Sequence, residues 1–578
     1  MAGFIVSNLN KFKNIDNNEN NSNNDFIKYK NYSIQKSLIN KFDNDKIFIE
    51  NDEYILITDG VILNKNELCN ESNLETYIST SIESGKSDFF NEFRGSFNGS
   101  YYIKNFDEWH FYTNHIGDKP IFYYFNDGYF ICSSSFEYII DQLLENEIKY
   151  TLDNLAVYDM LTYGFMVADK GSHTFVQEIK KLDAGTSLTI SNKNLKINRY
   201  HMFDNEHTLK DSVSEKDIIE EIDKKFRNAV LLQFKKDEEY GYKHLVSLSG
   251  GLDSRMTTWV ANDLGFSDIT SLTFCQSEYL DETIAKEISD YLDTTLIFKS
   301  LNNAKYLMNI DDVVKKNFGL TLYSGIAHEY SSLDCLNFNK FGALHTGQVG
   351  DAILGTHLDS DKLTKPQCFD GAYSMKFKDK VENMNFDFYK NNELSFIYNR
   401  GFRAAGCSQL ALTNFTEIIS PFLDIDFCEY CLSIPLKLRL NHYIYKKWVI
   451  EKYPDAANFK WEKTNSKLTD TKVQLFMHKV FKIGIGNVFP YIVRKVIKDY
   501  PIKINKKNMN PFDYWLNNKK YLKNYMNDYF QLNINNSKFN DSIRNDLTNM
   551  YLQGSAVEKS QVLTVLSVVK IYFEDNKE

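Results

Sequence analysis

Short apolar runs separated by turn-forming residues dominate the chain between residue 46 and about residue 200. The runs are rich in aromatic and β-branched residues, and Asp-Gly or Asn-rich breaks lie between them. Spacing of roughly ten residues between such runs is typical of antiparallel sheets packed face to face. The pattern predicts a β-rich N-terminal half with strands at KIFIE, YILIT, FNGSYYI, WHFYT, IFYYF and YFICSS.

The hydrophobic pattern changes after the polar stretch 203–216, which we interpret as the linker between two domains. Residues 217–234 then place apolar side chains at helical spacing. Predicted strands and helices alternate from there, which favours a parallel doubly wound sheet. In order, these elements are strand 244–248, a helix from Arg255, strand 269–274, helix 281–292 and strand 294–298.

The remaining segments set the expected domain boundaries. The Asn-rich segment 7–24 is predicted as a loop, because it cannot bury enough apolar surface to offset its ordering entropy. Beyond residue 400 the pattern is mostly helical, and no motif is recognised near the C-terminus. We therefore expect an N-terminal domain at 1–205, a second domain at 206–480 and a helical extension at 481–578.

Composition narrows the function classes. Apolar residues make up 43% and charged residues 25% of the 578, which are values of a globular protein. The net charge of −10 disfavours broad nucleic-acid binding. No stretch reaches the ~20 apolar residues of a membrane helix, and the N-terminus MAGFIVSNLN is not a signal peptide pattern. A soluble cytoplasmic protein without nucleic-acid or membrane partners is expected.

The eight cysteines are scattered along the chain and form no disulfide framework. Cys428 and Cys431 are the single close pair, whereas a four-thiolate zinc site would need a second pair. We interpret the thiols as packing residues and expect no zinc site.

One short segment between a predicted strand and a predicted helix combines glycine, serine and aspartate; it reads Ser249-Gly250-Gly251-Leu252-Asp253-Ser254. Glycines let a backbone approach a phosphate closely, and N–H groups at a helix start point at an anion. The serines add hydroxyl donors, and the aspartate can hold Mg²⁺. An ordinary turn is the alternative, but this whole set in a strand–loop–helix context favours a nucleotide site.

This segment resembles the SGGxDS loop of the PP-loop ATP pyrophosphatases, which cleave ATP between its α and β phosphates and adenylate a substrate. The resemblance implies ATP and Mg²⁺ as cofactors. It also implies that the following residues bind the nucleotide: Leu248, Ser249, Gly250, Gly251, Asp253 and Ser254.

Three later segments are similar to the asparagine synthetase branch of that superfamily. HTGQVGDA at 345–352 resembles its SGEGxDE segment, which implies that Thr346 and Gly347 line the adenine side and that Asp351 is a second Mg²⁺ ligand. SPFLD at 420–424 resembles its PFLD stretch.

The third segment is KWEK at 460–463. It stands where the branch has a lysine that stabilises charge during adenylation. Lys463 is the predicted catalytic lysine, and Lys467 is its main rival. A solvated surface lysine is the alternative reading for either position.

The N-terminal half resembles the same branch in the expected order. Residues 59–68, 95–97, 117–124 and 174–185 are similar to its NGEIYN…EL, GxF, GxKPLYY and TxFxxIxxLxPG segments. The resemblance spans about 1–470. It implies an Ntn-type antiparallel β-sandwich flanked by helices, followed by the parallel-sheet PP-loop synthetase domain.

Several family residues are absent. Class II glutamine amidotransferases use an N-terminal Cys as nucleophile, and here Ala2 follows Met1. The family's pocket residues are also replaced: no early-loop Arg is found, Val61 stands for a carboxylate, and Asn73 stands at the place of the pocket Asp. These changes together predict that glutamine hydrolysis is lost.

The synthetase segment departs from the family as well. Gln348 replaces a Glu thought to take a proton from ammonia, and a neutral amide cannot act as a general base. Ala352 replaces a second acid. Retained ATP residues with altered ammonia-handling residues favour a carboxylate substrate other than aspartate.

The sequence therefore predicts an ATP-dependent amide-forming ligase in which Asp253, Asp351 and Lys463 are catalytic. Its partners would be a small-molecule or peptide carboxylate and an amine donor, which is either ammonia or an amine of the substrate. Ammonia-dependent asparagine synthesis and cyclisation of the lasso-peptide or β-lactam type are alternatives. A non-catalytic scaffold is the alternative from another class, and a homodimer is left open.

Overall fold

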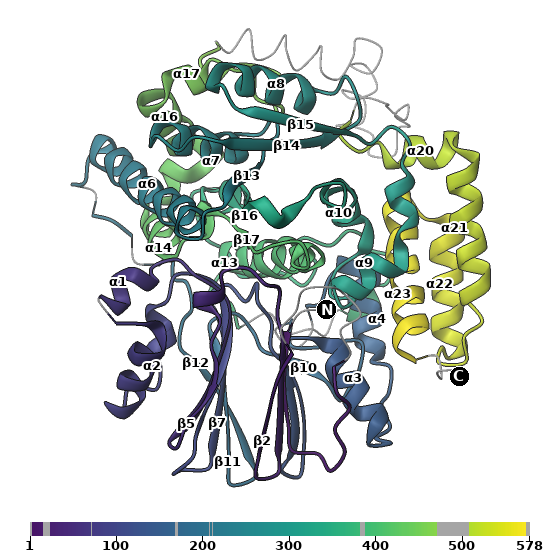
Figure 1. Ribbon diagram of the computed structural model, residues 1–578. Helices are drawn as coiled ribbons and strands as arrows, with labels where there is room; N and C mark the ends of the chain where they lie inside the picture. Colours follow the sequence, from purple (N-terminus) through teal and green to yellow (C-terminus); the bar gives the residue numbers. More distant parts are fainter. Residues whose placement is uncertain are drawn as a thin grey trace.

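The computed structural model describes most of the chain, and Figure 1 shows its arrangement. The described residues are 3–15, 24–70, 72–167, 171–206, 208–210, 212–381, 388–470 and 508–573. A two-sheet layer forms one end of the molecule, a parallel sheet with helices the other, and a helical bundle lies along one side (Figure 1). These layers confirm the expected α+β and α/β fold class.

The N-terminal half is a sandwich of two antiparallel six-stranded sheets. Alternating side chains such as Phe4, Val6, Ile57 and Trp109 meet between the sheets in one apolar core. The first sheet has the order β10 (Lys180–Lys181), β8 (Phe122–Asn126), β9 (Tyr129–Ser133), β1 (Gly3–Ser7), β3 (Tyr32–Ser37), β2 (Asn24–Tyr29). The second has the order β12 (Asn194–Arg199), β11 (Thr186–Ser191), β7 (Glu108–Thr113), β6 (Gly95–Ile103), β5 (Tyr54–Ile62), β4 (Phe48–Glu50).

The six predicted strands between 46 and 134 are confirmed, but the sandwich begins earlier than predicted. Strands β1, β2 and β3 precede residue 46, and β1 is the central strand that pairs with both β3 and β9. The apolar run of β1 is too short to be distinctive, so pairing with distant strands decides its structure. Of the predicted loop 7–24, residues 16–23 lie outside the described residues.

Helices cover both outer faces of the sandwich. On one face, α1 (Lys65–Cys69) and α2 (Leu74–Glu83) pack on side chains of β5 and β6. On the other, α3 (Phe136–Glu145) and α4 (Asn154–Tyr163) join a large core shared with the second half.

The second half is built on a five-stranded parallel sheet with the order β15-β14-β13-β16-β17. Leu245 and Val246 are neighbours in β13, yet they belong to apolar cores on opposite faces. A parallel sheet that is buried on both faces in this way is the doubly wound arrangement predicted. The strands are β13 (Lys243–Ser247), β14 (Ile269–Cys275), β15 (Thr295–Ser300), β16 (Phe341–His345) and β17 (Ile418–Ile419).

Helices α6 (Glu215–Glu239), α7 (Leu252–Asp263) and α8 (Leu280–Leu292) cover one face of this sheet, as their spacing predicted. On the other face lie α9 (Ile310–Lys316) and α10 (Ala327–Leu333) (Figure 1).

The C-terminal helices bind the two halves together. Helix α23 (Ala556–Phe573) contacts α4 of the first half and α9 of the second. The Gln561 side chain donates to the carbonyl of Met160, and Thr564 accepts from the backbone of Tyr323. The other helices of the bundle are α20 (Phe512–Asn518), α21 (Lys520–Asn533) and α22 (Asp541–Gln553). Of the predicted helical extension, 481–507 and 574–578 lie outside the described residues.

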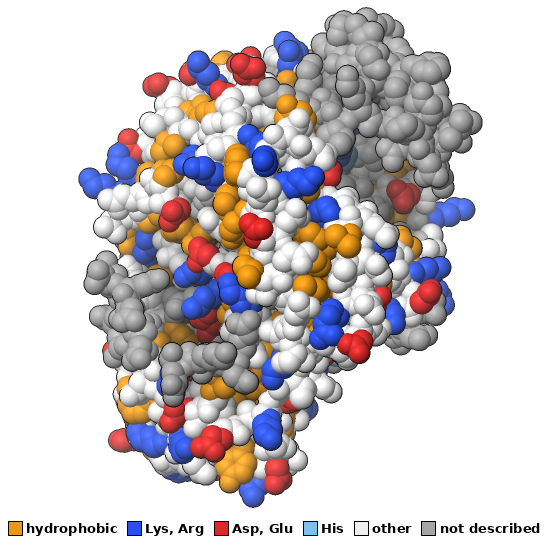
Figure 2. Space-filling model, turned by 90° about the vertical axis from the view of Figure 1, so that its right-hand side faces the viewer, with side chains coloured by type: hydrophobic (Ala, Val, Ile, Leu, Met, Phe, Trp, Pro, Cys, Tyr) orange, Lys and Arg blue, Asp and Glu red, His pale blue; other side chains and the backbone are white. Residues whose placement is uncertain are grey.

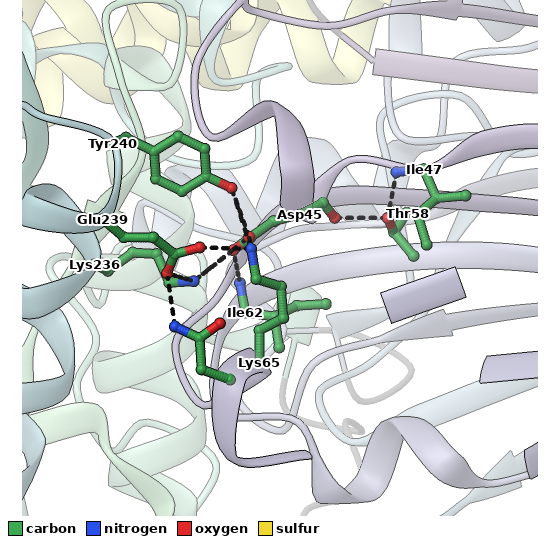
Figure 3. Close-up of polar contacts among 9 residues, drawn as sticks. Asp45, Ile47, Thr58, Ile62, Lys65, Lys236, Glu239 and Tyr240 are labelled. Atoms are coloured by element: carbon green, nitrogen blue, oxygen red, sulfur yellow. Dashed lines mark hydrogen bonds and ion pairs between the residues drawn. The ribbon is translucent and has the colours of Figure 1, made fainter. Parts of the chain in front are cut away.

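A buried polar network also crosses the boundary between the halves (Figure 3). Asp45 accepts hydrogen bonds from Lys65 of its own half (2.8 Å) and from Tyr240 of the other (2.8 Å). Lys236 lies 3.2 Å from the Asp45 carboxylate, and Glu239 joins both lysines. Because both Asp45 and Lys236 are almost fully buried, the network fixes the two halves against each other.

The distribution of surface charge and the burial of the close cysteine pair are as the composition predicted. Positive and negative side chains are interspersed on the face shown in Figure 2, without a stripe of one sign. Of the described helices, none combines the length and apolar character needed to cross a membrane. All eight cysteines are free, and Cys428 and Cys431 are buried in an apolar core as predicted.

Candidate active site

A cleft of about 480 Å³ opens at the carboxyl ends of the parallel strands. It lies where the strand order reverses, between β13 and β16, which is the usual ligand position in open α/β sheets. Three segments far apart in sequence line it: the turn after β13, the turn after β16, and the segment around Lys463. The structure thus brings together three of the four segments that the sequence singled out in this half. The fourth, SPFLD at 420–424, borders a separate cavity between the halves.

The turn after β13 is held by its own serines. The Ser249 backbone N–H donates to Ser254 Oγ at 2.9 Å, and the two hydroxyls lie 2.9 Å apart. The N–H of Gly251 donates to Ser249 Oγ at 3.1 Å. Helix α7 then begins at Leu252, so its positive end faces the cleft. The two hydroxyls and the N-terminal end of α7 border the cleft, which suits an anion.

The two glycines of this turn are needed for different reasons. A Cβ on Gly250 would lie 3.0 Å from Asp281 and 3.0 Å from Glu462. The Gly250 N–H donates to Asp281 Oδ1 at 2.7 Å, so that group is engaged within the protein. A Cβ on Gly251 would contact only the hydroxyl of Ser249, because this glycine borders the open cleft.

The turn after β16 lies directly against the first turn. A Cβ on Gly347 would come within 2.3 Å of the Ser254 nitrogen, and one on Gly350 within 2.8 Å of the Asp253 carboxyl carbon. Val349 adopts a left-handed backbone conformation, with φ 67°. A β-branched residue in this region is strained, and such strain gathers at functional sites.

Asp253 and Asp351 contact each other where these turns touch. The backbone N–H of Asp351, at the start of α11 (Gly350–Ile353), donates to Asp253 Oδ2 at 2.9 Å. Burial, and next the charge of Asp351, raise the pKa of Asp253 to about 7. Tyr445 donates to the other Asp253 oxygen at 2.7 Å. Two neighbouring carboxylates in a partly buried cleft are a donor set that fits a hard divalent cation such as Mg²⁺.

Lys463 also lines the cleft, close enough for its charge to act on Asp253. Its ammonium group is 3.2 Å from His442 Nε2 and 5.5 Å from the centre of the Trp461 ring. Burial and the nearby Lys463 charge lower the pKa of His442 to about 4, so this imidazole is neutral. Lys467 does not line the cleft, and its backbone N–H donates to Asp470. The geometry therefore favours Lys463 over its rival.

Most of the predicted site residues border the cleft. They are Ser249, Gly251, Asp253, Ser254, Thr346, Gly347, Asp351 and Lys463. Leu248 and Gly250 do not border it: the Leu248 side chain is 1% exposed, and its backbone pairs with the sheet.

Several residues that line the cleft or contact its side chains were not found from the sequence. Tyr445 and His442 lie outside any recognised motif, and only the fold brings them to Asp253 and Lys463. His328 and Glu329 of α10, together with Phe274, form the far wall of the cleft. A His-Glu pair in a short helix carries no signal by itself, so these residues could not have been predicted.

A second, smaller cavity of about 60 Å³ lies between the halves. Arg94, His115 and Asp118 border it from the N-terminal side, while Thr346 and Gln348 border both this cavity and the cleft. The cleft and the interdomain cavity are therefore adjacent.

The replaced glutamine-pocket positions serve as structural residues here. Val61 is fully buried in an apolar cluster with Ala343 and Ile419 of the second half. Asn73 caps helix α2 by accepting a hydrogen bond from the Thr76 backbone at 2.8 Å. Ala2, the position of the family's nucleophile, lies outside the described residues.

Comparisons with known proteins agree with the motifs. A family described as glutamine amidotransferase domain matches residues 46–201. A relative from Methanocaldococcus jannaschii, named "Putative asparagine synthetase (glutamine-hydrolyzing) 2", is 26% identical over 343 residues. That match covers 56% of this chain and 64% of the relative, so the chain spans just under two thirds of the relative's length.

Solved structures show a distant likeness. A Bacillus subtilis glutamine phosphoribosylpyrophosphate amidotransferase in complex with ADP and GMP has a TM-score of 0.23 at 9% identity, covering 47% of this chain and 77% of that one. The allosteric regulatory enzyme of purine biosynthesis has a TM-score of 0.21 at 9% identity, covering 46% and 66%.

Proposed function

We propose, from the premise that this chain belongs to the asparagine synthetase family, that it is an ATP-dependent ligase forming an amide from a carboxylate and an amine. The carboxylate would be activated as its AMP ester with release of pyrophosphate. The observation that carries the proposal is the contact between Asp253 and Asp351, which joins two distant turns at one cleft beside Lys463.

Each side chain has a role that follows from its place. Ser249 and Ser254 hydroxyls and the Gly251 backbone would bind the leaving pyrophosphate. Asp253 and Asp351 would hold Mg²⁺, which would neutralise charge on the phosphates. Lys463 would offset the negative charge that builds up as the carboxylate oxygen attacks the α-phosphorus. Catalysis of this kind consists of positioning and electrostatic stabilisation.

The N-terminal half would not supply ammonia from glutamine. Three observations support this: Ala2 has no nucleophilic atom, Val61 is committed to interdomain packing, and Asn73 to a helix cap. The amine would therefore be free ammonia or an amine of the substrate. With Gln348 in place of an acid, a carboxylate other than aspartate is favoured, and sugar acids are candidates.

Pyrophosphate exchange into ATP tests the activation step without knowledge of the amine. The purified chain is incubated with Mg·ATP, labelled pyrophosphate and a panel of carboxylates: L-aspartate, L-glutamate, D-glucuronate and D-galacturonate. We expect exchange that depends on one of them. Asp253→Ala should reduce it by about 1,000-fold or more, because phosphate charge is then uncompensated. Wild-type exchange rates in Asp253→Ala would remove this residue from the site.

A further inference from the structure

We propose that Glu329 is the proton acceptor for the amine that attacks the AMP ester. This inference rests on the proposed ligase function and adds to it a catalytic residue from helix α10, outside the family-like segments. Glu329 lines the same cleft as Asp253 and Lys463.

Glu329 is a buried carboxyl group placed at an opening. Its residue is only 5% exposed, yet it borders the cleft together with Ser247, Thr346 and Gln348. The polar side chains that face its carboxylate are Ser247, on the cleft side, and Gln409, which borders the interdomain cavity. Glu329 thus lies near the point where the two cavities approach each other, and Gln348 borders both cavities.

Its surroundings favour the protonated form to an unusual degree. Burial raises the pKa of Glu329 to about 7, and the neighbouring polar side chains of Ser247 and Gln409 only partly offset this. Among the described residues, no positively charged side chain forms an ion pair with Glu329. A carboxyl group that titrates near neutral pH can accept and release a proton during turnover.

The neighbours of α10 do not replace it in this role. Helix α10 packs against β14, η3 (Lys305–Met308), η4 (Tyr323–Gly325) and η7 (Gln409–Leu412). Their titratable groups are Cys275, Tyr306 and Tyr323, whose pKa values burial raises, and Lys305, which is exposed. Burial also lowers the pKa of His328 to about 4, so it is a weak base.

The other titratable groups of the cleft are Asp253, Asp351, Glu462 and Lys463.

The proposed chemistry requires such an acceptor. The amine lone pair forms the new N–C bond at the acyl carbon, and the C–O bond to AMP breaks, with its electron pair leaving on the AMP phosphate. The nitrogen loses one proton in this step, and the Glu329 carboxylate takes it. Gln348, at the same junction, is a neutral amide and cannot do so.

Glu329→Gln separates this role from activation. The variant keeps the shape and hydrogen-bonding capacity of the side chain but removes the base. We expect pyrophosphate exchange with the active carboxylate to stay within about twofold of wild type, whereas amide formation from ammonium chloride falls about 100-fold or more. Hydroxylamine, a stronger nucleophile, should still trap the AMP ester as a hydroxamate at a near wild-type rate.

The pH profile gives a second readout. At a constant concentration of unprotonated ammonia, wild-type amide formation should rise with a midpoint near the Glu329 pKa of about 7. The Glu329→Gln variant should lose this limb. Glu329→Asp keeps a carboxylate and should recover part of the rate. The matched control is Asp424→Asn, because Asp424 is another buried carboxyl group with a pKa raised to about 6 that caps α14 (Ile425–Ser433). It should keep both rates and the limb, since Asn caps a helix equally well.

The outcomes separate the two proposals. Unchanged amide formation and pH profile in Glu329→Gln would overturn the inference alone. Parallel loss of exchange and amide formation would also overturn it, because Glu329 would then act in activation. Absence of exchange in the wild type with every carboxylate would overturn the proposed function, and the inference would fall with it.

Discussion

The two halves of the molecule treat their family-like positions in opposite ways. In the second half, the turns after β13 and β16 direct serines, N–H groups and two carboxylates into an open cleft. In the first half, Val61 packs into an apolar cluster and Asn73 closes a helix end. Under the proposed function, polar groups face open space in the second half, whereas the corresponding positions of the first half contribute to packing and helix capping.

The first half also contributes residues to the interface with the second half. Asp45, Lys65, Lys236, Glu239 and Tyr240 form a buried network across it (Figure 3). The first half therefore contributes to the structure of the molecule. It packs against residues of the parallel sheet and lines one side of the interdomain cavity beside the cleft.

The largest expected effect on stability comes from the centre of this network. Asp45→Asn leaves Lys65 and Lys236 with weaker compensation in a buried place, and should lower the free energy of unfolding by about 3 kcal/mol. Urea unfolding followed by tryptophan fluorescence measures this. Asp141→Asn, at the exposed pair with Lys13, is the control and should change stability by less than about 1 kcal/mol. Equal effects of the two variants would show that the network does not hold the halves together.

The next effect concerns the two candidate lysines. Lys463→Ala should slow pyrophosphate exchange by about 100-fold, because a positive charge facing the cleft is lost. Lys467→Ala is the matched control, since its side chain lies outside the cleft, and it should stay within about twofold of wild type. The reverse ranking would assign the role to Lys467.

These predictions draw on sequence and fold to different degrees. The strands between 46 and 134, the alternation after 217 and the turn at 249–254 could be predicted, because periodicity and local motifs are properties of short segments. Strands β1 to β3 could not, because their pairing partners lie far away in the chain. For the same reason, Glu329 reaches the cleft only through tertiary packing. Tertiary packing likewise brings His442 to Lys463 and Tyr445 to Asp253.

A smaller effect concerns the pH dependence of stability that a buried carboxyl group of the first half causes. Burial raises the pKa of Asp118, beside the interdomain cavity, to about 6. A raised folded-state pKa means that the folded chain binds the proton more tightly than the unfolded chain, so this contribution to stability is present at low pH and is lost as pH rises through about 6. Asp118→Asn removes the titration. Its stability relative to wild type should therefore improve by about 1–2 kcal/mol between pH 4 and pH 7.

Thermal unfolding at several pH values checks this, with Asp141→Asn again as a control whose difference from wild type should stay flat. A difference between Asp118→Asn and wild type that does not change with pH would contradict the assigned cause.

The smallest effect is expected from restoring the nucleophile alone. Ala2→Cys, with Met1 removed, should give no detectable conversion of glutamine to glutamate, because Val61 and Asn73 remain engaged elsewhere. Glutamate release is measured with an enzyme-coupled assay, and alkylation confirms that the new cysteine is accessible. Turnover in this variant would show that the pocket has survived.

The central claim is that the cleft of the second half binds Mg·ATP through the Asp253 and Asp351 pair. Calorimetric titration of the full chain with Mg²⁺ and a non-hydrolysable ATP analogue tests it most directly. We expect saturable heat with one nucleotide bound per chain, and loss of that heat in Asp253→Ala. Absence of heat in the wild type, or unchanged binding in Asp253→Ala, would contradict it.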